Sequence, residues 1–379
     1  MRIFGVPMRE RLKNLDPILL VCMLFLSFVS ILTILTSVDS LQSSMRVKVM
    51  QLAMTVLGMI ILFIIANLDY RFFVERFALI MLIASVAILL LTLFLGSTGE
   101  GERETGNRSW LSLFGIISIQ PSEFVKITFL CTFAKHIETV KDTINRPRSL
   151  IGLLIHAALM VGLIVLSGDL GVALVYMGIA LFMLYFAGVS GWYFLGAIAT
   201  VGISLPFLWT LLRSDQQNRI IYGFFPELDP TNWGMQALVS RDAIAAGGFF
   251  GRGAAEGGIY ESLPEHHTDF IFATICEKFG LILGILSIIA LVVIVIRLLW
   301  IALTCREFVG RLICGGIAAM IIVQTLENLW MCLAMVPVIG ITLPFLSYGG
   351  SSVLALYVIM GLAYSVSAQE KKLFFRRDR

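Results

Sequence analysis

Long apolar segments without charge constrain this chain more than any other feature of its sequence. The segment 170–212 holds no Asp, Glu, Lys or Arg, and several further segments of comparable composition follow one another along the chain. A helix needs about 20 apolar residues to cross the hydrocarbon core of a bilayer. A water-soluble fold cannot bury apolar surface on this scale. We therefore predict an all-α polytopic membrane protein.

Composition narrows the class further. Of the 379 residues, 58% are apolar and 14% are charged, whereas soluble domains average about 45–50% and ~25%. A mean hydropathy of +0.92 agrees with this. These values exclude a soluble enzyme, a disordered chain and a nucleic-acid-binding protein. All six cysteines lie in or beside apolar segments and none has CxxC spacing, so we expect neither a disulfide framework nor a zinc site.

We expect about ten membrane-spanning helices. The stretch 170–212 is split at 187–191, where the sequence AGVSG is typical of a turn. A tenth span, 123–137, carries two lysines and is inferred from the chain ends, which are both rich in Lys and Arg. Basic ends are expected to be cytoplasmic, and two cytoplasmic ends require an even number of spans. The other expected spans are 17–38, 49–68, 77–96, 149–168, the two halves of 170–212, 279–296, 312–335 and 349–368.

This topology makes residues 1–379 one integral-membrane domain with two long extracytoplasmic loops, 97–120 and 213–267. Long loops often carry function, so we expect the working face to lie outside the membrane. Nucleotide-activated substrates are not expected there. A synthetic reaction on that face would need a substrate that brings its own leaving group, and a lipid-linked pyrophosphate is the natural candidate.

The first chemical motif begins at Gln120 and continues Pro121-Ser122-Glu123, with Lys126 three residues later. Proline fits the first turn of a helix, and an acid there suits the helix dipole. Residues three apart share one helix face, so Glu123 and Lys126 can form a local ion pair on an interfacial helix. The depth of Lys126 in an apolar segment favours a functional role instead.

A single acid, Asp169, stands in the turn sequence SGDLG between two apolar segments. It fits a helix N-cap at the membrane surface, and it fits equally a buried acid that faces a partner. The preceding loop offers Trp110, which is an interface anchor or a substrate contact. Glu327 within a predicted span needs a partner that the sequence does not identify.

The second long loop ends in Leu-Pro-Glu-His-His-Thr-Asp-Phe, residues 263–270. Thr268 resembles a helix N-cap and Asp269 an acid in the first turn, so capping alone explains both. We do not expect His266 and His267 to bind a metal together, because adjacent side chains point apart. The sequence Gly-Arg-Gly at 251–253 is not a nucleotide-binding loop, although it can place Arg252 and backbone N–H groups near phosphate.

Residues 343–352, Leu-Pro-Phe-Leu-Ser-Tyr-Gly-Gly-Ser-Ser, join the last two predicted spans. Small residues at a helix start allow close backbone approach. We expect this segment to pack against the bundle or to form a broken, re-entrant element that lines a cavity.

Taken together, the QPSE segment with Lys126, the DLG at 169–171, LPEHHTDFIFA at 263–273 and LPFLSYGGSS at 343–352 resemble the SEDS family (shape, elongation, division, sporulation). The resemblance runs through nearly the whole chain in the same order. The short chain ends and the LPF before SYGGSS resemble the elongation members of the family more than its division members.

The resemblance implies a SEDS-type fold and a peptidoglycan glycosyltransferase of the bacterial cytoplasmic (inner) membrane. Such an enzyme polymerises lipid II on the outer face and releases undecaprenyl pyrophosphate. Its implied partners are a class B penicillin-binding protein, which is a transpeptidase, and other membrane proteins of the elongation complex.

The resemblance also implies site residues. Asp269 matches the essential acid of the family and would act as general base, while Lys126 would neutralise the leaving pyrophosphate with Arg219 or Arg252. Glu123 would orient Lys126 or help to hold a divalent cation, Mg or Mn, which is possible without being required. The substrate-binding positions implied in addition are Asp169, Trp110, Arg219, Ser240 and Arg252.

Three alternatives remain at this point. Ten spans with broken helices and intramembrane charges also suit a lipid II flippase. A division-type polymerase of the same family is the second alternative, and a scaffold that only recruits partners is the third. The absence of a clear internal repeat and the grouping of polar residues outside the midplane weigh against a transporter.

Overall fold

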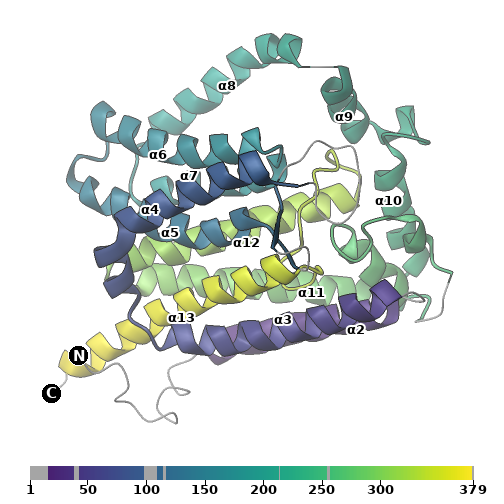
Figure 1. Cartoon of the computed structure of the whole chain (residues 1–379), viewed down its shortest axis with the longest axis horizontal. Helices are drawn as coiled ribbons and strands as arrows, with labels where there is room; N and C mark the ends of the chain where they lie inside the picture. The colour runs from purple at the N-terminus through teal and green to yellow at the C-terminus, as the bar shows by residue number, and fades with distance from the viewer. Residues whose placement is uncertain are drawn as a thin grey trace.

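The computed structural model describes residues 16–37, 42–97, 109–113, 117–212, 214–253 and 257–377. Long helices dominate it and run side by side along one general direction (Figure 1). The membrane-domain helices are α2 (Pro17–Ser37), α3 (Gln42–Ala66), α4 (Tyr70–Leu95), α5 (Pro121–Thr139), α6 (Pro147–Leu166), α7 (Leu170–Phe186), α8 (Gly191–Leu211), α11 (Ile271–Thr304), α12 (Phe308–Cys332) and α13 (Gly350–Arg377).

These helices agree with the expected spans, most of them to within a few residues. Seven are long and apolar enough to cross a membrane, while α7 and the part Gly191–Phe207 of α8 count as shorter apolar helices. The helix α5 occupies the position of the weakest predicted span. The all-α polytopic membrane fold is confirmed, whereas the count of ten spans and the cytoplasmic ends stay predictions.

Exposed apolar side chains cover the outside of the bundle. On α4, for example, Leu79 is 69% exposed and Phe94 is 76% exposed. On α8 nearly every described side chain is exposed. Such surfaces are unfavourable in water but are what a helix presents to lipid. The protein is therefore a multi-pass membrane protein.

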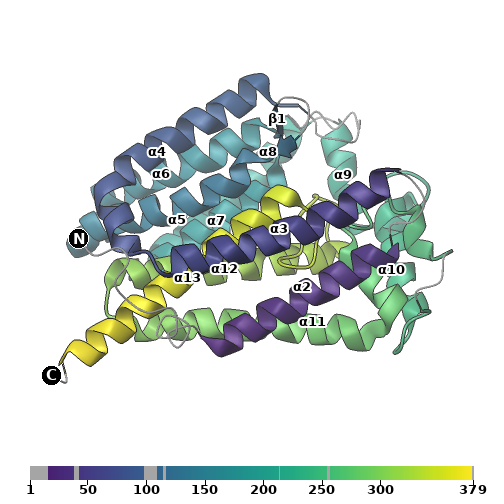
Figure 2. The same cartoon turned by 60° about the horizontal axis from the view of Figure 1, so that its bottom comes forward.

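The centre of the bundle is formed by α12 and α13. The most apolar 18-residue windows of these two helices are 72% and 78% buried, compared with 17% for α4. Both views place α13 beside α3 and α2 beside α11, segments that are far apart in the sequence (Figures 1 and 2). A polar group on α12 is consequently surrounded by protein, which makes this helix the natural support for a site.

The two predicted outer loops contain regular structure. Within 97–120, a short antiparallel hairpin pairs β1 (Leu111–Leu113) with β2 (Ile117–Ile119). Within 213–267 lie α9 (Ser214–Phe224) and α10 (Met235–Gly247), with short 3-10 turns at Pro226–Leu228 and Ile259–Ser262. Helices can form in this second loop because their apolar faces can pack on the bundle end, as Ala243 of α10 does. Both helices lie at the end of the bundle away from the last turns of α13 (Figure 1).

The helix α11 begins earlier than the predicted span and contains a break. Gly280 has φ of 87°, so the chain leaves helical geometry there and resumes it immediately afterwards. The backbone oxygen of Phe249 would lie 2.2 Å from a Cβ at this position. Only glycine meets both conditions. The break redirects the first two turns of α11 toward the outer loop.

The helix cap predicted at Thr268 was wrong. The helix α11 starts at Ile271 with Phe270 as its cap residue, so Asp269 lies before the helix and not in its first turn. Thr268 instead turns back and donates its hydroxyl to Glu265, at 2.8 Å. Asp269 thus belongs to an irregular segment, and its position depends on contacts from elsewhere in the fold.

The segment between α12 and α13, residues 333–349, is irregular, and its middle part, residues 341–347, is mostly buried. It contains two non-glycine residues in the left-handed region, Ala334 with φ of 58° and Phe345 with φ of 65°. Such a backbone conformation costs about 1–2 kcal/mol of free energy per residue, and it persists only where the surrounding structure imposes it. Residues 343–349 of the expected element are irregular, whereas residues 350–352 already belong to α13, and we call residues 339–348 the strap.

Candidate functional site

The start of α5 places the first pair of charges. Gln120 is the cap residue, Pro121 occupies the first turn and Glu123 follows in the same turn, as the sequence indicates. Lys126 lies one turn further along the same face. Its Nζ donates to Glu123 Oε1 at 2.7 Å.

This ion pair is sealed inside the protein. The Lys126 and Glu123 side chains are only 1% and 6% exposed. Removing two charges from water costs several kcal/mol per ion, which their attraction offsets only with good geometry. A pair at this depth is therefore a weak means of gaining stability and a strong candidate for function.

Asp169 supports the same helix start from the side. It caps α7 through a bond from the Val172 N–H, 3.1 Å long, and its other oxygen accepts from Gln120 Nε2 at 2.7 Å. Asp169 is 6% exposed. Burial raises its pKa, and the bonds from Val172 and Gln120 act in the opposite direction. Asp169 is therefore a helix cap that is buried against α5 and not exposed at a surface.

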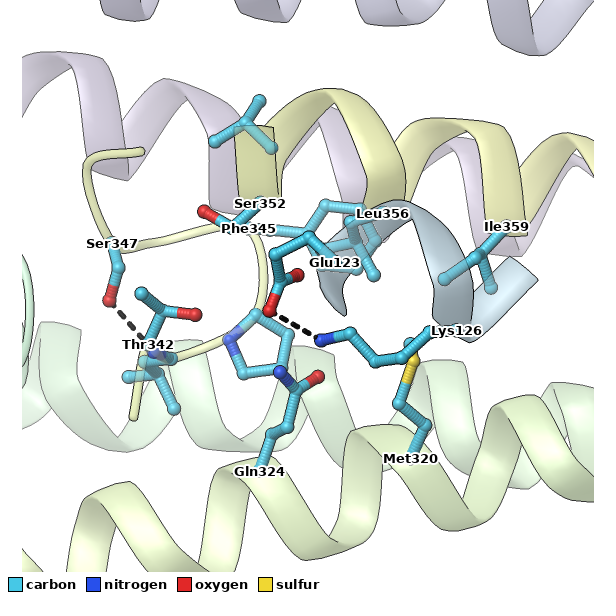
Figure 3. A pocket seen from close by; sticks show the side chains of 13 residues that line it. Glu123, Lys126, Met320, Gln324, Thr342, Phe345, Ser347, Ser352, Leu356 and Ile359 are labelled. Atoms are coloured by element: carbon cyan, nitrogen blue, oxygen red, sulfur yellow. Dashed lines mark hydrogen bonds and ion pairs between the residues drawn. The ribbon is translucent and has the colours of Figure 1, made fainter. Parts of the chain in front are cut away.

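A cavity opens beside the Glu123–Lys126 pair (Figure 3). Its volume is about 20 Å³, room for about one water molecule. The walls come from α5, α12, the strap and the first three turns of α13. Glu123, Lys126 and Gln324 point toward one another from α5 and α12 (Figure 3). The other polar side chains in the lining are Thr342, Ser347 and Ser352.

Hydrogen bonds to consecutive backbone carbonyl oxygens hold the chain in place around Asp269. The oxygen of His267 accepts from the Tyr348 N–H at 2.9 Å, and that of Thr268 accepts from the Ser347 hydroxyl at 2.7 Å. Asp269 O accepts from Asn328 Nδ2, also at 2.7 Å. Three successive carbonyls are therefore fixed by the strap region and α12, which compensates for the absence of a regular helix here.

The Asp269 carboxylate itself lies against Gly340. A Cβ built on Gly340 would be 3.2 Å from Asp269 Oδ2, and Gly340 has φ of 72°. Any larger residue would be strained in its backbone and would crowd the carboxylate. The strap thus touches both parts of the site, because it lines the Lys126 cavity and also borders Asp269.

The helix α12 joins the two parts in the same way. Gln324 faces the Lys126 cavity, and Asn328 one turn later donates to Asp269 O and to Ile341 O. Neither residue stood out in the sequence, because uncharged polar residues in an apolar helix do not by themselves indicate a site. The one signal that could have found them is their separation by four positions, which places both side chains on one face of the span.

Two imidazoles adjoin Asp269. His266 Nδ1 lies 2.9 Å from Leu263 O, so this nitrogen carries a proton and donates it to the carbonyl. His267 packs against the Tyr348 ring. Burial, with a smaller contribution from His266, lowers the pKa of His267 to about 4. His267 is therefore uncharged near neutral pH.

The remaining predicted residues lie around this centre. Trp110 is half-buried and pairs with Ser97 through two backbone bonds. Arg219 is exposed on α9. Ser240 is fully buried and donates to Cys332 O at 2.9 Å, which ties α10 to α12.

Arg252 forms an ion pair with Glu277 at 3.2 Å while half of its side chain stays exposed. Glu277 is 1% exposed and also accepts from the N–H groups of Ile259 and Tyr260. It is the anchor of the outer loop that sequence reasoning missed. A Glu-Lys pair inside an apolar run was the signal that could have found it.

Metal ligands are sparse in the described part of the chain. No group of three or more His, Cys, Asp or Glu side chains is arranged there to hold an ion. The six cysteines are all free. The carboxylates of the site do not by themselves form a cation cage.

Comparison with known proteins decides the family. A family model described as cell cycle protein, covering the FtsW, RodA and SpoVE proteins, matches residues 13–372. The chain belongs to this family.

Relatives in this family are similar over most of their length. The peptidoglycan glycosyltransferase MrdB of Escherichia coli (strain K12) is 33% identical over 366 residues, which are 95% of each chain. The stage V sporulation protein E of Bacillus subtilis is 33% identical over 325 residues, 84% of this chain and 86% of its own.

Solved structures give the same fold. A chain from a peptidoglycan synthase complex, described for its coordination of polymerization and crosslinking, aligns with a TM-score of 0.81 and 27% identity over 94% of this chain and 98% of its own. The rod shape determining protein RodA of Thermus thermophilus aligns with a TM-score of 0.68 over 93% of this chain and 96% of its own, with 24% identity. This chain is accordingly a membrane glycosyltransferase of the family.

Proposed function

We propose that the chain is a peptidoglycan glycosyltransferase that polymerises lipid II at the outer face of the bacterial cytoplasmic membrane and releases undecaprenyl pyrophosphate. The observation that carries the proposal is one strap that lines the sealed Glu123–Lys126 pair and also borders Asp269. A general base and a buried cation at one end of the bundle are what glycosyl transfer from a pyrophosphate-linked donor needs.

Asp269 is the general base of this mechanism. The 4-hydroxyl of the acceptor sugar attacks the anomeric carbon of the donor from the face opposite the pyrophosphate. The new C–O bond forms as the bond to the leaving phosphate oxygen breaks, and the hydroxyl proton passes to Asp269. The configuration at the anomeric carbon inverts. Asp269 suits this task because its backbone is fixed while its side chain remains partly accessible.

Lys126 stabilises the negative charge that develops on the departing pyrophosphate. A buried ammonium acts strongly there because little water screens it. Glu123 orients Lys126 through their 2.7 Å bond. Asp169 fixes the start of α5 through Gln120. No step is assigned to a divalent cation.

Four outer residues complete the proposal. Trp110 and Arg219 are accessible enough to contact substrate. Arg252 can reach an anion with the exposed half of its side chain. Ser240 acts indirectly, by holding α10 on α12 through its hydroxyl, and does not contact the substrate.

The partner we propose is a class B penicillin-binding protein that crosslinks the glycan strands made here, within an elongation complex of membrane proteins. The similar chain from a peptidoglycan synthase complex supports this. The 95% coverage of MrdB favours an elongation role over a division role.

The test is polymerisation of labelled lipid II by the purified full-length protein, alone and with its penicillin-binding partner. We expect Asp269→Asn to lower the rate at least about 1,000-fold, within the range for loss of a general base, while the folded protein is retained. Asp242→Asn on the exposed face of α10 is the matched control and should be fully active. Normal turnover by Asp269→Asn would overturn the assignment.

Transport is the second candidate. If the wild type makes no polymer from intact lipid II with its partner present, a vesicle assay for lipid II scrambling decides between a flippase and an inactive preparation.

A further inference from the structure

Gln324 is a buried amide without a partner. It is 4% exposed, points into the Lys126 cavity (Figure 3), and makes no hydrogen bond to any residue that the structure describes. A buried polar group left unpaired costs about 1–3 kcal/mol. Gln51, which is similarly buried, bonds instead to the Ser30 hydroxyl and to Ser347 O of the strap. The Gln324 amide is therefore available to a ligand.

Lys126 has unused donors in the same cavity. An ammonium group carries three N–H donors, and within the described residues Glu123 alone accepts from it. Lys126 is 1% exposed, so bulk water does not satisfy the other two. Two donors from Lys126 and two from the Gln324 amide thus converge on one enclosed space.

The first turn of α13 adds further donors. This helix runs for 28 residues from Gly350, and no acceptor for the N–H groups of residues 350–352 lies within the described part of the chain. Ser352 of this turn lines the cavity. Helix N-termini favour anions because their free N–H groups and the helix dipole both present positive charge.

We propose that Gln324, Lys126 and the first turn of α13 form the subsite for the pyrophosphate group of the lipid-linked substrate. This assignment rests on the proposed function for the identity of the substrate, but its chemistry is that of any pyrophosphate anion. It places the anion on the bundle side of the strap and not among the exposed arginines Arg219 and Arg252. Because the cavity has room for about one water molecule, binding must widen it.

The competing ligand for the same donors is a neutral group of the substrate, such as an acetamido or hydroxyl group of the sugar. A negative charge at position 324 repels an anion, whereas a neutral hydroxyl or amide N–H group can donate to it. The two possibilities can therefore be separated by two substitutions at one residue.

The experiment measures pyrophosphate binding by the purified full-length protein, using inorganic pyrophosphate in one arm and undecaprenyl pyrophosphate in the other. We expect Gln324→Leu to weaken both ligands by about 10-fold, the effect of losing a hydrogen bond to a charged group. Gln324→Glu should weaken both by about 100-fold, because it sets a carboxylate against the anion. If the wild type binds undecaprenyl pyrophosphate more tightly than inorganic pyrophosphate, the lipid-linked group is the natural ligand.

Thr325→Val is the control, since Thr325 is the next residue on α12 and its buried hydroxyl also lacks a partner, but it does not line the cavity. It should bind pyrophosphate as the wild type does. Unfolding midpoints without ligand must agree among the variants compared. If Gln324→Leu is less stable than the wild type, Gln324→Met replaces it, and the pyrophosphate affinity of Gln324→Glu is compared with that of Gln324→Met.

Wild-type affinity in Gln324→Glu, or weaker binding in Gln324→Leu alone, would overturn the subsite, as would failure of the wild type to bind either pyrophosphate. These outcomes are independent of turnover. Binding that depends on Gln324 in a protein that makes no polymer would contradict the proposed function and leave the subsite in place. Polymer formation together with unchanged pyrophosphate binding in both Gln324 variants would overturn the subsite and leave the proposed function in place.

Discussion

The two halves of the site are held in place by different means. The Lys126 half stands on regular helices, and its charges are paired and enclosed. The Asp269 half consists of irregular backbone, which hydrogen bonds to three successive carbonyls hold in position. The first half fixes charge and the second fixes the direction of one carboxylate.

This difference suits the proposed chemistry. Charge stabilisation acts over several ångströms and depends mainly on exclusion of water, which close helix packing provides. A general base must lie within hydrogen-bond reach of one proton, which the many backbone bonds around Asp269 can secure. We therefore expect substitutions in the two halves to affect stability and turnover in different ways.

The largest effect is expected from breaking the Glu123–Lys126 pair. Lys126→Met leaves Glu123 buried without its cation, which costs about 3–5 kcal/mol of stability. The double variant Glu123→Gln with Lys126→Met should recover most of this stability. Polymerisation should fall at least about 100-fold in both variants, because neither can stabilise the departing charge. Thermal unfolding and lipid II turnover measure the two effects separately.

Lys135 and Glu138 provide a matched control on the same helix. They form an ion pair with the same spacing, at 2.6 Å, but about 30% of each side chain is exposed. Lys135→Met should cost less than about 1 kcal/mol and leave turnover unchanged. If Lys126→Met behaved like Lys135→Met, the enclosed pair would be an ordinary structural contact.

The sequence predicted the Lys126 half better than the Asp269 half, for a physical reason. Charge in an apolar run, proline at a helix start and a spacing of three are local patterns, and they determine the geometry of Glu123 and Lys126 directly. The position of Asp269 depends on partners far away in the chain, such as Asn328 and Gly340. Local reasoning therefore gave a helix cap where the chain has a strap contact.

The same limit explains the outer loop. Its length and polarity do not reveal the helices α9 and α10, because these helices depend on burial against the bundle end. Glu277 was missed because its role is to accept N–H groups from Ile259 and Tyr260. Such a role appears only once the loop has folded back onto α11.

An intermediate effect is expected from pH, through His267 in the Asp269 half. Its folded-state pKa is about 4, whereas an unfolded histidine titrates near 6.5. Below pH 6.5 the unfolded chain takes up a proton that the folded chain does not, so stability falls as pH falls from 6.5 to 4. The loss amounts to about 3 kcal/mol, and above pH 6.5 the contribution is complete.

Unfolding midpoints measured across this pH range test the prediction. His267→Gln should flatten the slope between pH 6.5 and 4, since it removes the titrating group while keeping a polar side chain. An unchanged slope in this variant would mean that other groups cause the loss of stability.

The smallest effect concerns strain at the beginning of the irregular region. Ala334 has φ of 58° directly after α12, a position where glycine avoids a cost of about 1–2 kcal/mol. Glycine also adds freedom to the unfolded chain, which offsets about 0.4–1 kcal/mol of the gain. We therefore expect Ala334→Gly to raise stability by about 0.5–1 kcal/mol, whereas Ala245→Gly within α10 should lower it by about 1 kcal/mol. Opposite shifts in unfolding midpoint would show that the segment between α12 and α13, which borders Asp269, is held against its backbone preference, and equal shifts would contradict this.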